Sequence, residues 1–162
     1  HPVAIAGGGR GGDHLVAAEI CPDSGELAVL DLALCFCARS QISDKDGVAI
    51  LGTPGGSRII SMLLLAVLGL SEEQPLEALV SAPRLHHQYL PDQIEFEPEA
   101  LTPSQVEALG AMGHRLQPLE HGYGNMQAIY WDRRANRVDA ASDPRGIGSS
   151  VVSPAPGSIL QR

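Results

Sequence analysis

Apolar and polar residues follow two different periods along the chain, and together they predict both strands and helices. Short runs that are apolar, or that alternate apolar with polar, predict strands at residues 48–51, 94–97, 114–119, 126–131 and 137–141. A longer apolar run predicts a helix over residues 59–70, and apolar positions 76, 79 and 80 predict another that ends before Pro83. Strands and helices are interleaved along the chain, so the sequence predicts a fold that contains both.

The clearest helix boundary begins at Thr102. The sequence Thr102-Pro103-Ser104-Gln105 supplies an N-cap hydroxyl, a proline in the first turn and a glutamine three residues after the cap, which is the pattern of a capping box. Val106, Leu109 and Met112 follow at helical spacing, and Gly113 is typical of a helix end. We therefore predict a helix whose buried stripe consists of these three apolar side chains.

The N-terminal part of the chain has a different composition from the rest. It is rich in glycine, with a weak strand pattern at residues 3–6 and an apolar run at residues 27–37. Serine, proline and glycine dominate after Val152, which is typical of a loose tail. We therefore divide the chain into a segment of doubtful origin at residues 1–45, a domain at residues 46–150 and a flexible tail at residues 151–162.

The overall composition narrows the class of partner. The 162 residues suffice for one ordinary domain, and the net charge of -8 argues against binding to nucleic acid or to an anionic membrane surface. The longest apolar run, residues 62–70, is far shorter than the roughly 20 residues that cross a bilayer. The three cysteines have no histidine nearby at zinc-ligand spacing. We expect a small molecule or a protein as partner, with no metal and no cofactor.

The sequence Gly52-Thr53-Pro54-Gly55-Gly56-Ser57-Arg58 joins a predicted strand to a predicted helix. Adjacent glycines at such a junction let a ligand approach bare backbone N–H groups, and the helix N-terminus adds positive potential. A tight turn that binds no ligand needs the same glycines and is the alternative interpretation. The phosphate-loop pattern Gly-x-x-x-x-Gly-Lys-Ser/Thr is absent. The loop is therefore a candidate oxyanion or anion site.

Two other groups of polar residues give weaker signals. Adjacent side chains in a regular element point apart, so His86 and His87 cannot both bind one metal without a turn, and structural roles are favoured for them. Ser57, Ser142 and Asp143 could join a histidine in a serine triad, but neither serine lies in a Gly-x-Ser-x-Gly pattern. Neither group is a strong candidate for a catalytic site.

A third candidate lies in the N-terminal segment. The glycine cluster from Gly7 to Gly12 contains Gly-x-Gly-x-x-Gly after a possible strand, and Asp31 follows at a distance suited to a ribose contact. A glycine-rich segment matches this pattern easily by chance, and Cys21-Pro22 interrupts the helix that should follow. A dinucleotide-binding module is therefore one alternative function, and a non-catalytic partner-binding domain is another.

Four blocks of sequence, taken in order, resemble the C-terminal part of the bacterial type of gamma-glutamyltransferase. The blocks are GVAILGTPGGSRII (47–60), APRLHHQYLPD (82–92), YGNMQA (123–128) and AASDPRG (140–146). The resemblance covers residues 46–147, about two thirds of the chain.

This resemblance implies an α+β fold, namely the αββα sandwich of an N-terminal-nucleophile hydrolase, made as a precursor that cuts itself into a large and a small subunit. It implies that the new N-terminal threonine of the small subunit attacks the gamma-glutamyl carbonyl of glutathione or a related compound, and that the acyl group then passes to water or an amine. The N–H groups of Gly55 and Gly56 are the implied oxyanion donors. The large subunit is the implied partner, and the implied location is periplasmic or secreted.

The chain departs from this family near its N-terminus. It begins with His1-Pro2 where the family has Thr-Thr-His, and its only threonines are Thr53 and Thr102. The family's Asp-Asp-Phe and Pro-Leu-Ser-Ser-Met blocks, which hold the gamma-glutamyl donor, are also missing. One set of codons for residues 29–33 spells Ser-Ser-Ile-Ser-Pro one base out of phase, so we hypothesise that residues 1 to about 43 are an out-of-frame translation. We therefore predict that this chain contains no nucleophile and is inactive alone.

Overall fold

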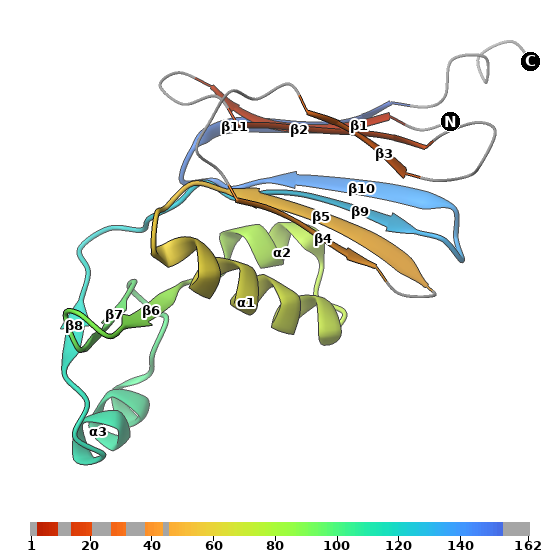
Figure 1. The fold of residues 1–162 in the computed structure, drawn as a ribbon. Coiled ribbons are helices and arrows are strands. Elements are labelled where there is room, and N and C mark those ends of the chain that lie inside the picture. Colours follow the sequence, from red (N-terminus) through yellow and green to blue (C-terminus); the bar gives the residue numbers. More distant parts are fainter. Residues whose placement is uncertain (1–2, 10–13, 21–26, 32–37, 44–45, 154–162) are drawn as a thin grey trace, which may run out of the picture.

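The computed structural model describes residues 3–9, 14–20, 27–31, 38–43 and 46–153. Two four-stranded antiparallel sheets stack on each other, and the first of them is an outer layer (Figure 1). The first sheet has the order β11-β1-β2-β3, and the bounds of these strands are Ile147–Ser153, Val3–Gly9, His14–Ile20 and Leu27–Asp31. The second sheet has the order β10-β9-β5-β4, with bounds Arg137–Ser142, Gln127–Asp132, Gly47–Thr53 and Ala38–Ser43.

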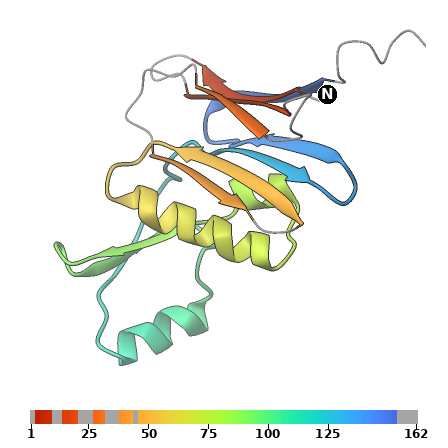
Figure 2. The ribbon, with the colours of Figure 1, turned by 45° about the vertical axis from the view of Figure 1, so that its right-hand side comes forward.

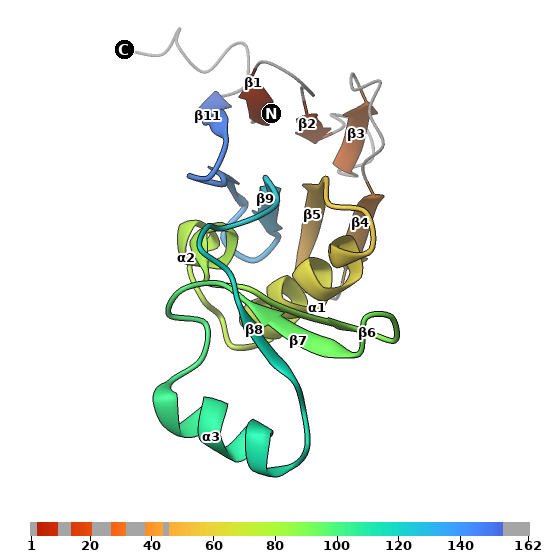
Figure 3. The ribbon, with the colours of Figure 1, turned by 90° about the vertical axis from the view of Figure 1, so that its left-hand side faces the viewer.

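Strand β5 lies in the interior of the second sheet, and all seven of its residues are buried. It pairs with β9 on one side, where Ile50 lies opposite Ile129, and with β4 on the other. One face of this sheet is covered by the first sheet and the other by helices (Figure 3). The nearly continuous apolar sequence of β5 fits a strand that is covered on both faces.

Helices α1 (Arg58–Ser71) and α2 (Leu76–Ser81) lie on the face of the second sheet that points away from the first (Figures 1 and 3). The core between them and the sheet consists of Leu51, Met62, Ala66, Leu76, Leu79, Val80, Met126, Ala128 and Ala141. The layers therefore run sheet, sheet, helices, which corresponds to three layers of an αββα sandwich.

A smaller unit projects from these layers (Figure 2). It contains a three-stranded sheet of β6 (Leu85–Gln88), β7 (Gln93–Phe96) and β8 (Leu116–Pro118), together with helix α3 (Pro103–Ala111). β6 and β7 form an antiparallel pair, and β8 joins β7 in parallel. This sheet brings β7 close to the start of α1, which matters for the candidate site.

Most elements predicted after Gly47 are confirmed, namely β5, β7, β8, β9, β10 and the three helices. The capping box at Thr102 is also confirmed, since its hydroxyl accepts from the Gln105 N–H and the Gln105 side chain accepts from the Thr102 N–H. The pattern did not predict β2, β4, β6 or β11 as strands. β11 extends through residues 151–153, where a tail was predicted, and residues 154–162 lie outside the described part.

The predicted buried stripe of α3 is wrong. No residue of α3 is buried, Val106 and Leu109 are half-buried, and Met112 is 75% exposed. The physical reason is the position of α3, which lies at the far end of the projecting unit, beyond the small sheet (Figure 1). Helical spacing correctly indicated the helix but not how much of its apolar face another element covers.

The dinucleotide-binding alternative is not supported. Gly7, Gly8 and Gly9 lie inside β1, which pairs antiparallel with both β2 and β11. The next described element, from His14, is strand β2, whereas the dinucleotide fold needs a helix after the glycines. Asp31 ends strand β3, and residues 10–13 and 21–26 lie outside the described part.

Candidate functional site

The candidate loop connects the end of β5 to the start of α1. Gly55 has a φ of 152° and Gly56 a φ of 58°, both in the region that favours glycine. Two backbone bonds close the loop, from the Arg58 N–H to the Gly55 carbonyl at 3.1 Å and from the Ile59 N–H to the Gly56 carbonyl at 3.2 Å.

The N–H groups of the two glycines are available to a ligand. Both residues are exposed, and neither N–H donates to another residue in the described part of the chain. They lie at the N-terminus of a 14-residue helix, where unpaired N–H groups and the helix dipole favour an anion.

Met62 forms the floor of this loop. A Cβ atom on Gly55 would lie 2.6 Å from Cε of Met62, and one on Gly124 would lie 2.5 Å from Sδ of the same side chain. Met62 itself is only 1% exposed. A Cβ on Gly56, by contrast, would meet no described atom within 4 Å. The loop is therefore packed on protein at Gly55 and open at Gly56.

Arg58, the first residue of α1, connects the loop to the projecting unit. Its Nε and Nη2 atoms both donate to Oε2 of Glu95 on β7, at 3.1 and 2.5 Å. Its guanidinium carbon lies 4.7 Å from the centre of the Tyr123 ring, which is a cation–π contact. The hydrogen bond from Arg58 holds the pKa of Glu95 below its ordinary value. The ion pair is therefore fully charged at neutral pH.

Burial, followed by the nearby charge of Glu97, raises the pKa of Tyr123 to about 12. Its phenol is therefore neutral at physiological pH. The hydroxyl is buried and has no hydrogen-bond partner among the described residues. The ring of Tyr123 thus acts here as a face for Arg58 rather than as an acid.

Two arginines and two carboxylates form a buried network next to Tyr123. Arg84, Glu97 and Asp143 are 2%, 2% and 1% exposed. Nη2 of Arg84 donates to Oδ2 of Asp143, Nη1 of Arg145 donates to Oδ1 of Asp143 at 3.1 Å, and Nη2 of Arg145 donates to Oε2 of Glu97 at 2.6 Å. Burial by itself lowers the pKa of Arg145, but the bond to Glu97 and the charge of Asp143 outweigh it, so the pKa is raised. Every charge in the network therefore has an opposite charge beside it, as burial requires.

The network also binds backbone groups and so joins segments that are distant in sequence. Glu97 accepts from the N–H of Arg84 at 3.1 Å and from the N–H of Tyr123 at 2.7 Å. Asp143 accepts from the N–H of Met126 at 2.9 Å. Three of the four blocks that carry the family resemblance, residues 82–92, 123–128 and 140–146, therefore meet here. The network holds Tyr123 in place, and Tyr123 in turn contacts Arg58.

The histidine pair has structural partners, as the sequence favours. His86 is buried, and its ring nitrogens lie 2.8 Å from Oγ of Ser61 and 3.0 Å from Oε1 of Gln88. His87 is exposed, and its Nε2 lies 2.9 Å from Oδ1 of Asp92. Within the described residues, no group of three or more His, Cys, Asp or Glu side chains is arranged to hold a metal ion.

The serine triad is not assembled. The Ser142 hydroxyl donates to Oε1 of Gln127 at 2.6 Å. Asp143 accepts from Arg84 and Arg145 rather than from a histidine. Ser57 precedes α1 and its hydroxyl makes no capping bond. None of the three residues is therefore placed for nucleophilic catalysis.

Sequence reasoning missed the arginines of the network, although a signal for them exists. Arg84 and Arg145 each follow a proline, in Ala82-Pro83-Arg84 and Asp143-Pro144-Arg145. A repeated Pro-Arg pair in an otherwise acidic chain could have indicated two fixed cations. Their partner Glu97 carries no comparable signal, because it lies in a segment that reads as a half-exposed strand.

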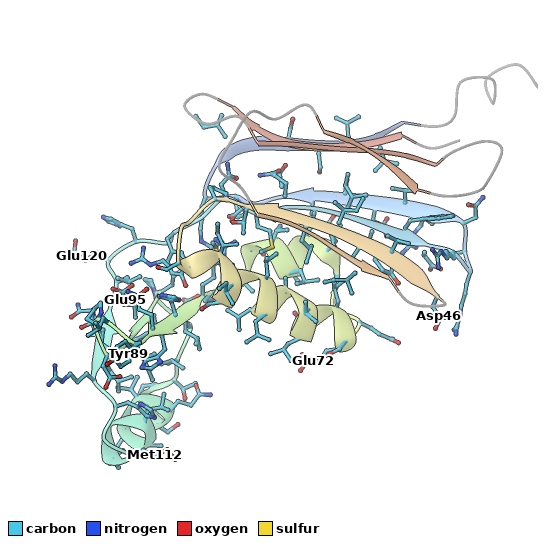
Figure 4. All side chains as sticks on the ribbon, in the orientation of Figure 1. Asp46, Glu72, Tyr89, Glu95, Met112 and Glu120 are labelled. Atoms are coloured by element: carbon cyan, nitrogen blue, oxygen red, sulfur yellow. The ribbon has the colours of Figure 1, made fainter. Side chains whose placement is uncertain are left out.

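A cavity of about 650 Å³ lies at the other end of α1, away from the glycine loop. Leu70, Leu76 and Tyr130 line it, together with the Asp46 and Arg134 side chains, which form an ion pair at 2.7 Å. Figure 4 shows Asp46 at the opposite end of the molecule from Glu95. None of residues 52–58 lines this cavity, so it is not part of the candidate site.

The stacked sheets, the helical layer and the glycine loop define an αββα protein of the N-terminal-nucleophile hydrolase class. The profile of the gamma-glutamyltranspeptidase family matches residues 39–153, so the chain belongs to this family. Among the helices of the described part, none is both long enough and apolar enough to cross a membrane.

Individual relatives agree with this assignment. The glutathione hydrolase proenzyme of Pseudomonas aeruginosa is 41% identical over 117 residues, which cover 69% of this chain and 21% of that protein. The proenzyme of Escherichia coli is 34% identical over 106 residues, covering 64% of this chain and 18% of that protein. This chain thus spans about a fifth of the length of the proenzymes that it matches.

Solved structures show the same fold. The T380A mutant of Helicobacter pylori gamma-glutamyltranspeptidase superimposes with a TM-score of 0.61 at 25% identity, covering 77% of this chain and 69% of that chain. The gamma-glutamyltranspeptidase of Pseudomonas nitroreducens complexed with L-DON superimposes with a TM-score of 0.58 at 31% identity, covering 87% of this chain and 70% of that chain.

Proposed function

We propose that this chain is part of the small subunit of an enzyme that transfers or hydrolyses the gamma-glutamyl group of glutathione and related amides. The observation that carries the proposal is the geometry of Gly55 and Gly56. Both residues are exposed, neither N–H donates to another residue in the described part of the chain, and both precede the start of α1. Such a pair of donors is what a tetrahedral acyl intermediate needs when negative charge develops on its oxygen.

In this proposal the loop stabilises the oxyanion during both formation and breakdown of the gamma-glutamyl-enzyme intermediate. The donors are backbone groups of a loop packed on Met62, so they need little reorganisation as charge develops. Removing one donor of this kind typically costs about 10²- to 10³-fold in rate. The loop supplies no nucleophile of its own.

We propose that the attacking threonine is neither Thr53 nor Thr102, which are the two threonines of this chain. The isolated chain is therefore inactive in this proposal. Thr53 is 0% exposed, and its Oγ1 donates to the Pro54 carbonyl at 3.1 Å. Thr102 serves as the N-cap of α3 in the projecting unit. Neither hydroxyl is free to attack a substrate, which supports this part of the proposal.

We further propose that the partner is the large subunit of the same precursor. The relatives are proenzymes of which this chain spans about a fifth. The outer face of α1 carries four exposed apolar side chains, and Arg58 is its only charged residue. A helix that is apolar on nearly all sides is normally covered on all sides. A periplasmic or secreted location belongs to the same proposal.

The origin of residues 1–45 stays a separate prediction. Strands β1 to β3 pair through their backbones in a sheet with β11. Backbone pairing does not depend on the reading frame that encodes a segment. The strands therefore neither support nor contradict the hypothesis of an out-of-frame translation. The DNA sequence around these codons tests the hypothesis, because an out-of-frame segment would encode Ser-Ser-Ile-Ser-Pro at residues 29–33, which carries the serine pair of the family's Pro-Leu-Ser-Ser-Met block.

The oxyanion role is tested in a chimera that joins residues 46–146 to the N-terminal part of a homologous precursor with its own threonine. We expect Gly56→Ala to lower kcat and kcat/KM by a similar factor on a chromogenic gamma-glutamyl anilide, because it perturbs an interaction made in the transition state. An alanine here meets no described atom within 4 Å, so a clash with the described part of the chain does not cause the loss, and the strain of the positive φ needs a control.

Gly113→Ala is the matched control for this chimera. Gly113 also has a positive φ, of 96°, and open space around its Cβ position, but it lies at the end of α3. We expect this variant to keep the full rate. A Gly56→Ala chimera with unchanged kcat would instead identify the loop as a tight turn without a catalytic role.

A further inference from the structure

The local sequence does not secure the first turn of α1. Ser57 occupies the N-cap position with φ -61° and ψ -25°, and its hydroxyl makes no capping bond. The first turn has no acidic residue, and Arg58 instead places a positive charge at the positive end of the helix dipole. Capping hydroxyls and acidic side chains normally stabilise this position, whereas a cation destabilises it. Something outside the helix must therefore hold this turn.

Tertiary contacts of the Arg58 side chain stabilise the first turn of α1. Two of its nitrogen atoms donate to one oxygen of Glu95, and its planar group lies over the ring of Tyr123. The side chains of Arg58 and Glu95 are 33% and 19% exposed, so the pair is partly shielded from water. Glu95 is on the small sheet that projects from the layers (Figure 4), and Tyr123 precedes β9 and is itself held by Glu97. Arg58 is thus fixed from two separate segments.

The backbone of Arg58 is part of the glycine loop. Its N–H donates to the Gly55 carbonyl, and the N–H of the next residue, Ile59, donates to the Gly56 carbonyl. The orientation of a peptide group sets both its carbonyl and its N–H direction, because the group is planar. Fixing Arg58 therefore fixes the Gly55–Gly56 peptide group, which carries the Gly56 N–H, and the Gly56–Ser57 peptide group that follows it.

We propose that Arg58 is a positioning residue for the oxyanion loop and that Glu95 and Tyr123 hold it in place. The proposal rests on the oxyanion role proposed for Gly55 and Gly56. Arg58 touches no reacting atom in this scheme. Its guanidinium is neutralised by Glu95 and holds the loop, so that the Gly56 N–H keeps one direction when the substrate arrives.

Amide exchange and ¹⁵N relaxation in the 162-residue chain test the proposal. The variants are Arg58→Met, Arg58→Lys and Glu95→Gln, and the control is Arg137→Met, which removes an exposed ion pair with Asp139 in the β9–β10 hairpin. In Arg58→Met and Glu95→Gln we expect the amides of residues 58 and 59 to exchange at least about tenfold faster. Local opening of the first turn of α1 then no longer requires the Arg58–Glu95 ion pair to break. Exchange at Ile50 in the core should stay unchanged.

Two further measurements separate positioning from a general effect on folding. The order parameter of the Gly56 N–H should fall toward about 0.6 from a rigid value near 0.85 in Arg58→Met, and Arg58→Lys should restore part of the difference. Exchanging the two charges, with Arg58→Glu and Glu95→Arg together, should recover more protection than either change alone. In the chimera, Arg58→Met should lower kcat while KM changes little.

Unchanged exchange at residues 58 and 59 in both Arg58→Met and Glu95→Gln would overturn the proposal. A uniform loss of protection that includes Ile50 would also overturn it, because it would identify the pair as a general stabiliser. Failure of the oxyanion role is distinguishable from these results. In that case Gly56→Ala keeps its rate in the chimera while the local exchange differences remain.

Discussion

Arg84 donates through Nη2 to Oδ2 of Asp143, and the two side chains are only 3% and 0% exposed. The residues lie 59 positions apart in the sequence. Arg84 also donates to the carbonyls of Val80 and Tyr123, and Asp143 also accepts from the N–H of Met126. This ion pair is therefore a junction between the helical layer, the second sheet and the segment that contacts the oxyanion loop.

Breaking the Arg84–Asp143 ion pair should lower the free energy of unfolding. In Asp143→Asn the buried guanidinium of Arg84 loses its counter-charge, and removing one partner of a buried ion pair typically costs about 3 to 5 kcal/mol. Urea unfolding at pH 7 measures the loss. Asp139→Asn is the control, because the pair of Asp139 with Arg137 is largely exposed and should contribute less than about 1 kcal/mol. Equal losses in the two variants would contradict a structural role for the buried network.

Replacing Gly124 and Gly113 by alanine separates the effect of a steric clash from the effect of a strained backbone. Both have positive φ, 81° and 96°, so replacing either by alanine carries a backbone cost. At Gly124 the new Cβ would also lie 2.5 Å from Sδ of Met62, whereas at Gly113 it would meet no described atom within 4 Å. We expect Gly124→Ala to destabilise by about 1 to 3 kcal/mol more than Gly113→Ala, the usual cost of overpacking. Thermal unfolding of both variants checks this difference.

The Arg58–Glu95 pair should give stability a dependence on acid pH. Because the pKa of Glu95 is lowered from its ordinary value of about 4.5 in the folded state, the pair contributes fully above that value. The contribution is lost as the pH falls through the lowered pKa. We expect the difference in unfolding free energy between the native chain and Glu95→Gln to be constant from pH 7 to about pH 5 and to shrink below it. A difference that grows toward low pH would contradict this assignment.

The apolar face of α1 should be needed for binding the large subunit. Four side chains on this face are exposed: Ile60 (76%), Leu64 (57%), Val67 (37%) and Leu68 (51%). We expect Leu64→Glu together with Leu68→Glu to weaken binding of the chain to the large-subunit part of the Pseudomonas aeruginosa proenzyme by at least about tenfold, because buried contacts dominate interface affinity. Calorimetric titration measures the affinity.

Met112→Glu is the control for this experiment, since Met112 is 75% exposed but lies beyond the end of α3. It should bind as the native chain does. Self-association of the native chain through the same face, seen by sedimentation and lost in the double variant, would identify a second copy as the partner instead.

The features that depend on neighbouring residues could be predicted from the amino-acid sequence alone. β5 is predicted by its apolar run, α3 by the capping box at Thr102, and the loop between β5 and α1 by Gly55 and Gly56. In each case the physical cause lies within a few residues: hydrophobic periodicity, a side-chain cap, or the backbone freedom of glycine. The resemblance of the blocks added the identity of the family and the role proposed for the loop.

The contacts between side chains that are far apart in the sequence depend on how the elements pack. The partners Arg84 and Asp143 are 59 residues apart, and Arg58 and Glu95 are 37 residues apart, so no local pattern could pair them. Packing also determines which apolar helix faces are covered by other elements. The apolar stripes of α1 and α3 are equally visible as patterns, yet only the packing of layers shows which face of α1 is buried and that Met112 stays exposed. Periodicity records a preference for burial, and the arrangement of the remaining elements determines whether that preference is met.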